Sequence, residues 1–231
     1  KSSGGAQFLQ ATCSNTVRQL SSSAMHPVFQ FLLATFLFML IHVSVMALSA
    51  RAFGITIRRI AYGVGPTLFS IGKAQLRLLP FAGSVVLKDT REEDIYDDDR
   101  GQDIYNERPL WQQLAVLLSG VAVPLILALG LLGAQGWPIF TAAFPQIIAG
   151  ALAPLSTAQL LLSDGEAFAA AHGFALVFAL VSVKLCAFNL LPFGGLNGGQ
   201  ALLAIARGGK PYVTWEETVA KWLLLPGLAV L

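Results

Sequence analysis

Charged residues are scarce in this sequence. Asp, Glu, Lys and Arg make up 12% of its 231 residues, about half the fraction typical of soluble domains, while apolar residues make up 55%. Such a chain is neither disordered nor a nucleic-acid-binding module. The two cysteines, Cys13 and Cys186, are too few and too far apart for a disulfide framework or a metal cluster. The composition therefore predicts an integral membrane protein.

The few charges are unevenly distributed along the chain. Residues 1–88 carry eight lysines or arginines and no acid, whereas residues 89–108 carry nine of the thirteen acids. Residues 109–183 contain no lysine or arginine, and their only acids are Asp164 and Glu166. Blocks of this kind are typical of membrane topology, in which basic residues stay on one side of the bilayer.

Long apolar stretches predict the membrane-crossing helices. Residues 28–48 contain no charge, and they are long enough to cross about 30 Å of hydrocarbon at roughly 1.5 Å per residue. Residues 110–132 and 174–191 predict two further spans, and residues 219–231 begin another apolar helix. Residues 62–88 are interrupted by glycine and proline and alternate like short strands. The predicted fold is an α-helical integral membrane protein with about four transmembrane helices and a small membrane-associated β-hairpin or sheet after the first core helix.

The same patterns divide the chain into segments. We expect a polar tail over residues 1–27, a membrane core over residues 28–210 and the start of a further C-terminal helix over residues 211–231. Residues 139–162 are apolar enough to cross the membrane, but two prolines interrupt them. A full crossing there would place the later basic residues on the wrong side. We therefore expect a re-entrant or interfacial segment, with residues 134–172 on the side opposite the basic residues.

The acidic loop, residues 89–108, contains the sequence Asp-Ile-Tyr twice, at positions 94–96 and 103–105. The simplest interpretation is a solvated loop. The alternative is a docking strip, in which charge steers a basic partner and aromatic anchors supply affinity. Lys184, inside a predicted span, either snorkels, makes an internal contact or pairs with an acid of a partner. The candidate partner-binding residues are Tyr96, Tyr105, Asp97, Asp98, Asp99 and Lys184.

Four segments carry recognisable motifs. They read FMLIHVSVM at 38–46, YGVGP through LPFAGSV at 62–85, LSGVAVP at 118–124 and FNLLPFGGLNGG at 188–199. In this order they resemble the site-2 protease family of intramembrane zinc metalloproteases, over roughly residues 28–210. The resemblance implies a helical membrane core with a β-hairpin, built around a zinc site.

The residues that would form that zinc site are largely replaced. The family has His-Glu-x-x-His on its first core helix, an Asn on the next and a zinc-binding Asp on the last. Here His42 remains, Val43 stands at the catalytic Glu, Met46 at the second His, Pro124 at the Asn and Asn197 at the Asp. Zinc hydrolysis needs three ligands, a bound water and a base. The resemblance therefore implies no catalysis, no metal and no other cofactor, and it places His42 close to Asn197. We expect a backbone carbonyl or a nearby side chain to satisfy His42, and Asn197 is the candidate side chain.

The sequence thus favours a pseudoprotease, a catalytically inactive site-2-protease-like subunit with a structural or binding role in a larger membrane protein complex. The alternative is a divergent active metalloprotease that cleaves transmembrane substrates. A transporter ranks below both, because inverted repeats and a series of charged helices are missing. The expected partners are other membrane protein subunits and lipids, not nucleic acid. The expected location is a bacterial plasma membrane or the inner membrane of a mitochondrion or plastid.

Overall fold

The computed structural model describes residues 25–90, 103–210, 215–216 and 218–223. Most of this part of the chain is helical, and one small sheet follows the first helix. The elements are α2 (Pro27–Ala52), β1 (Ile57–Ile71), β2 (Ala74–Leu87), η2 (Tyr105–Glu107), α3 (Leu110–Leu132), η3 (Gly133–Gln135), α4 (Gly136–Leu152), α5 (Thr157–Ala171), α6 (Phe174–Asn189) and α7 (Asn197–Ala206).

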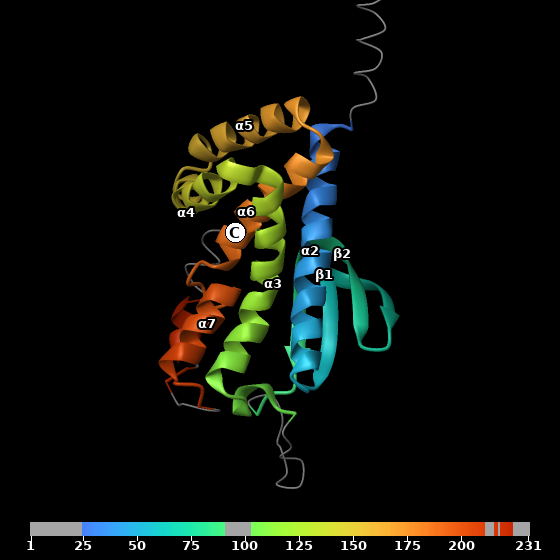
Figure 1. Cartoon of the computed structure of the whole chain (residues 1–231), viewed down its shortest axis with the longest axis vertical. Helices are drawn as coiled ribbons and strands as arrows, with labels where there is room; N and C mark the ends of the chain where they lie inside the picture. Colours follow the sequence, from blue (N-terminus) through green and yellow to red (C-terminus); the bar gives the residue numbers. More distant parts are fainter. Residues whose placement is uncertain (1–24, 91–102, 211–214, 217, 224–231) are drawn as a thin grey trace, which may run out of the picture.

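Three apolar helices form the core. α2 and α3 run side by side along the long axis of the molecule, and α6 packs against both (Figure 1). Buried small and aromatic side chains, among them Ala34, Phe38, Phe178 and Val183, fill the space between them. α2 and the continuous helical stretch Leu110–Leu152 are long and apolar enough to cross a membrane, whereas α6 has only 16 residues. The structure thus supports two spans within its described residues, and the expectation of about four stays a prediction.

Exposed tryptophans lie near both ends of α3. Trp111 is its second residue, and Trp137 follows shortly after its end. Both side chains are well exposed, at 61% and 60%. α3 has 23 residues, which makes it about 34 Å long at roughly 1.5 Å per residue. Tryptophans at this spacing are typical of the two membrane interfaces.

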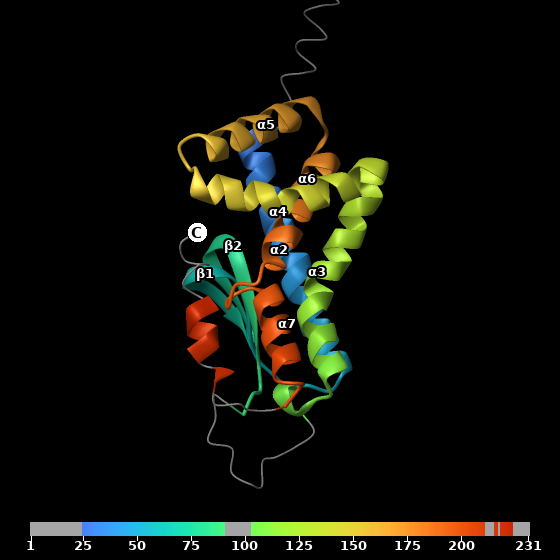
Figure 2. The same ribbon diagram turned by 90° about the vertical axis from the view of Figure 1, so that its left-hand side faces the viewer.

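Residues 139–162 belong to two helices rather than one. α4 and α5 turn away from the direction of α3 and lie across one end of the bundle (Figure 2). The break comes at Ala153, which has φ −135° and ψ 67°, because the following Pro154 disfavours the α conformation of the residue before it. The placement of this helix pair at a membrane interface stays a prediction.

The β-hairpin expected after the first core helix is present. Residues 60–62 pair with residues 83–85 on one side and with residues 74–76 on the other. Residues 74–76 pair in turn with residues 69–71, so the two bent strands supply four strand segments. One edge of the sheet is therefore formed by residues 83–87, the final segment of β2. The segments lie in the order 83–87, 57–62, 74–76 and 69–71.

Polar side chains connect the segment after α7 to α3, and the residue after β2 to Asp103. Arg207, after α7, forms an ion pair with Glu216 at 2.9 Å, and its other terminal nitrogen donates to Gln113 of α3 at 2.6 Å. Lys88 forms an ion pair with Asp103 at 3.2 Å. Desolvation of Asp103 works against its ionisation, but hydrogen bonds from Thr56 and Lys88 and the lysine charge outweigh it and lower the pKa of this carboxyl.

Candidate functional site

Three of the motif positions singled out in the sequence, His42, Met46 and Asn197, line one pocket of about 280 Å³. α2 supplies His42 and Met46, and the first turn of α7 supplies Asn197 and Gln200. The edge segment 83–87 forms the opposite wall. Residues far apart in the sequence thus meet where the resemblance predicted a common centre.

His42 bonds to the backbone of α3. Its side chain is buried, and its Nδ1 lies 2.8 Å from the carbonyl oxygen of Gly120. Because a carbonyl oxygen only accepts, Nδ1 carries the proton in this contact. The ring of Phe38 stacks on the imidazole with centroids 5.5 Å apart. The partner of His42 is therefore a backbone carbonyl, one of the two expected alternatives, and not Asn197.

Pro124 explains why this carbonyl needs a partner. It lies inside α3, four residues after Gly120. A helical carbonyl normally accepts from the N–H of the fourth residue ahead, and proline has no N–H. The oxygen of Gly120 therefore has no partner of this kind within its own helix, and His42 supplies the missing donor. Pro124 and His42 act together to satisfy the backbone of α3.

Asn197 also bonds to the backbone of α3, about one turn before Gly120. Its Nδ2 donates to the carbonyl oxygen of Leu117 and lies 3.4 Å from the sulfur of Met46. The amide nitrogen is thus turned toward α3 and α2. Met46 contributes a thioether, a weak acceptor, to this contact.

Val43 packs outside the pocket. Its side chain is fully buried and faces the sheet, where a Cβ added to Gly83 would lie 2.5 Å from its Cγ2. α3 approaches α2 as closely as the sheet does, since a Cβ added to Gly120 would lie 2.6 Å from Cγ of Met46 on α2. These two glycines let the sheet and α3 close on α2 at the position of the family's catalytic Glu.

A comparison with protein-family models agrees with this arrangement. The model of peptidase family M50, the site-2 protease family, matches residues 30–230. The chain belongs to peptidase family M50. A comparison with curated proteins found no significant match. Members of this family are membrane proteins, in keeping with the two long apolar helices.

The donor set of this M50 pocket does not fit a zinc ion. Zinc hydrolases use three ligands drawn from imidazole, thiolate and carboxylate, and keep a position open for water. The pocket offers one imidazole, from His42, and one carboxylate, from Asp89, together with the thioether of Met46 and the amide of Asn197. A thioether and an amide are poorly matched to this dication. Among the residues that the structure describes, no group of three His, Cys, Asp or Glu side chains could hold a metal.

Asp89 and Gln200 also line the pocket of this M50 chain, and the sequence analysis missed both as pocket residues. Asp89 is buried and interacts with other residues of the chain. It lies two residues beyond the end of β2, so the edge of the sheet carries it to the pocket. In the sequence, the only indication that Asp89 could reach the pocket was its position directly after the expected hairpin.

The candidate partner-binding residues fall into three groups. Tyr96, Asp97, Asp98 and Asp99 lie outside the described residues, so docking through them stays a prediction. Lys184 makes an internal contact, one of the expected alternatives, by donating to the Gln146 side chain of α4.

Tyr105 requires a correction. From the sequence, Tyr105 in the acidic loop was a candidate aromatic anchor for a partner. Its side chain is instead 7% exposed, packed in a cluster with Ala50, Ile55 and Val116. Its hydroxyl donates to the Gln113 carbonyl at 3.3 Å. The chain turns back under the end of α2 at this point, which buries the ring.

Proposed function

We propose that this member of peptidase family M50 is a pseudoprotease, a catalytically inactive subunit with a structural or binding role in a larger membrane protein complex. The observation that carries the proposal is that the chain's own contacts occupy the former catalytic positions. His42 and Asn197 each bond to a backbone carbonyl of α3, and Val43 packs against the sheet. Hydrolysis needs a metal or a base to activate water, and Val43, at the position of the family's catalytic Glu, cannot act as a base.

The binding surface that we propose is the sheet edge beside the pocket. Edge strands carry unpaired N–H and C=O groups, which can pair with an extended segment of another protein. Residues 83–87 form such an edge, and Ser84 is exposed on it. Asn197 and Gln200 also line the pocket, and their amide oxygens can accept hydrogen bonds from a bound backbone. An unwound part of a partner's transmembrane segment matches this surface in chemistry.

Site-specific photo-cross-linking tests this proposal. A photoreactive amino acid replaces Ser84 in one variant and Lys73 in a control variant. Lys73 is also exposed, but it lies in the turn between β1 and β2 and not at the pocket. We expect position 84 to form one prominent adduct with an intact membrane protein that also co-purifies with the wild-type chain. Equal adducts from both positions would contradict the proposed surface.

A second arm tests catalysis on the same partner. The cross-linked partner is purified, reconstituted with the chain in vesicles and incubated with zinc, and its length is followed by mass spectrometry. The pseudoprotease predicts no cleavage. Cleavage inside the partner's span, lost in His42→Ala or Asp89→Asn, would instead establish the alternative, a divergent active metalloprotease.

We propose a bacterial plasma membrane or an organelle inner membrane as the location.

A further inference from the structure

A second, larger cavity lies near the beginning of α2. Its volume is about 850 Å³, within the range of about 300–1,000 Å³ that small-molecule sites usually have. Leu32 at this cavity and His42 at the M50 pocket are ten residues apart on α2, which is about 15 Å along the helix axis. The cavity is therefore separate from the degenerate catalytic centre. α2, α4, α5 and α6 provide its walls.

A single lysine supplies positive charge to this cavity. Lys184 projects from α6 and donates to the amide oxygen of Gln146 on α4. Within the described part of the chain, no carboxylate forms an ion pair with it. A lysine charge within an apolar membrane segment is costly, and such residues usually have an anionic partner. The neutral amide satisfies one donor and leaves the charge uncompensated.

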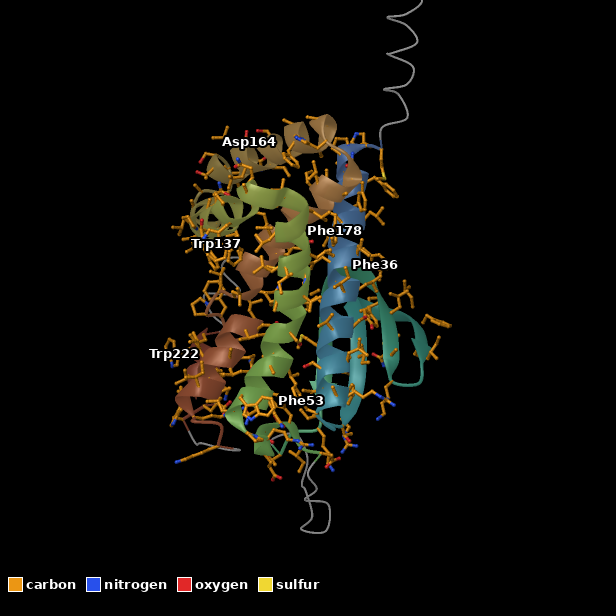
Figure 3. All side chains as sticks on the ribbon, viewed as in Figure 1. Phe36, Phe53, Trp137, Asp164, Phe178 and Trp222 are labelled. Carbon is orange, nitrogen blue, oxygen red and sulfur yellow. The ribbon has the colours of Figure 1, made fainter. Side chains whose placement is uncertain are left out.

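The opposite wall carries negative charge. Asp164 and Glu166 of α5 line the cavity and are also exposed. Figure 3 shows Asp164 on α5, the helix that lies across the end of the bundle. They are the only acids in residues 109–183. The lining of the cavity thus includes a cation on α6 and two anions on α5.

The remaining lining is apolar. It includes the side chains of Phe31, Leu32, Ile147, Leu161 and Leu180. Hydrocarbon chains bind such walls by the hydrophobic effect. A ligand complementary to the whole cavity has a hydrocarbon chain, one anionic group and one cationic group.

We propose that this cavity binds a zwitterionic phospholipid with an amine in its head group. Its phosphate pairs with Lys184, its amine lies toward Asp164 and Glu166, and one acyl chain follows the apolar walls. A fatty acid or an anionic phospholipid would also place an anion at the lysine, but it has no cationic group to pair with the two acids. The inference does not depend on the proposed function, since the cavity is separate from the M50 pocket.

Lipid retention measured by native mass spectrometry tests this site. The purified chain is reconstituted in vesicles with equal amounts of phosphatidylethanolamine, phosphatidylglycerol and oleate, extracted in mild detergent and weighed with its bound lipids. We expect one phosphatidylethanolamine per chain, in clear preference to the two anions. Lys184→Met should lower this retention about tenfold, as expected for the loss of a charge-assisted contact in a partly desolvated site. Lys184→Arg should restore it, and Lys73→Met, remote from the cavity, should leave it unchanged.

The acids provide an independent test on an exposed helix. Asp164→Asn with Glu166→Gln should shift the preference toward phosphatidylglycerol, because the amine of phosphatidylethanolamine then loses its anionic partners. Equal retention of all three lipids by the wild type would overturn the proposal. So would a preference for oleate or phosphatidylglycerol, or unchanged retention in a folded Lys184→Met variant. If that variant does not fold, an unchanged preference in the acid double variant overturns the proposal by itself.

Discussion

The hydrogen bond between His42 and the Gly120 carbonyl should be energetically coupled to Pro124. His42→Leu removes the donor and keeps a side chain of similar size. The Gly120 oxygen then stays buried without a partner, because Pro124 has no N–H to offer it. Pro124→Ala restores an N–H at the correct position in α3. The two substitutions should therefore be strongly non-additive.

The structure gives the size of this coupling. Leaving a buried acceptor unsatisfied costs about 1–3 kcal/mol, so His42→Leu should lower the free energy of unfolding by about that amount when Pro124 is present. In the Pro124→Ala background, the repaired helix should reduce this cost by about 1–2 kcal/mol. Substitution of His42 removes the stacking contact with Phe38 whether residue 124 is Pro or Ala. Substitution of Pro124 removes the packing of the proline ring whether residue 42 is His or Leu. Both losses therefore cancel in the coupling energy.

Equilibrium unfolding in mixed detergent micelles, followed by tryptophan fluorescence, measures all four proteins of the cycle. His42→Asn is the matched control, because its amide nitrogen stands near the position of Nδ1 and keeps a donor there. Its coupling to Pro124→Ala should be smaller than that of His42→Leu. Additivity of His42→Leu and Pro124→Ala within about 0.5 kcal/mol would refute the role assigned to His42.

Three further predictions concern contacts elsewhere in the chain. Gly120→Ala should destabilise the fold, because the new Cβ would lie 2.6 Å from a carbon of α2, whereas Gly130→Ala, with no atom within 4 Å, should be neutral or stabilise the helix in thermal unfolding. Tyr105→Ser should lower the free energy of unfolding by about 3 kcal/mol, and Tyr96→Ser should weaken co-purification with the partner if the docking strip is correct. The pKa of Asp103 is lowered in the fold. The stabilising contribution of this carboxylate should therefore be present at neutral pH and lost as the pH falls below about 4. Asp103→Asn should remove this part of the pH dependence of the free energy of unfolding.

The apolar helices and the hairpin could be predicted because their signals are local. The expected span 110–132 has the same bounds as α3, and the span 28–48 lies within α2. The convergence of His42, Met46 and Asn197 on one pocket followed from the order of the family motifs. Length, apolar composition and motif order can all be determined from the sequence without knowing how the helices cross.

The hydrogen-bond partners and the larger cavity could not be predicted, because they depend on packing between elements. Pro124 stands four residues after Gly120 in the sequence, which predicts a free carbonyl, but only the crossing of α2 and α3 brings His42 to it. The repeated Asp-Ile-Tyr suggested similar roles for Tyr96 and Tyr105. Burial of Tyr105 depends on its contact with the end of α2. The cavity near Lys184 exists only because α4 and α5 lie across the bundle.

The zinc content of the purified chain, measured by elemental analysis after expression with added zinc, tests the account most directly. The account predicts well below one zinc per chain, because only His42 remains of the family's ligand set. Met46→His with Asn197→Asp completes a set of three ligands with His42 and should gain about one zinc per chain. About one zinc in the wild type, lost in His42→Ala, would contradict the pseudoprotease.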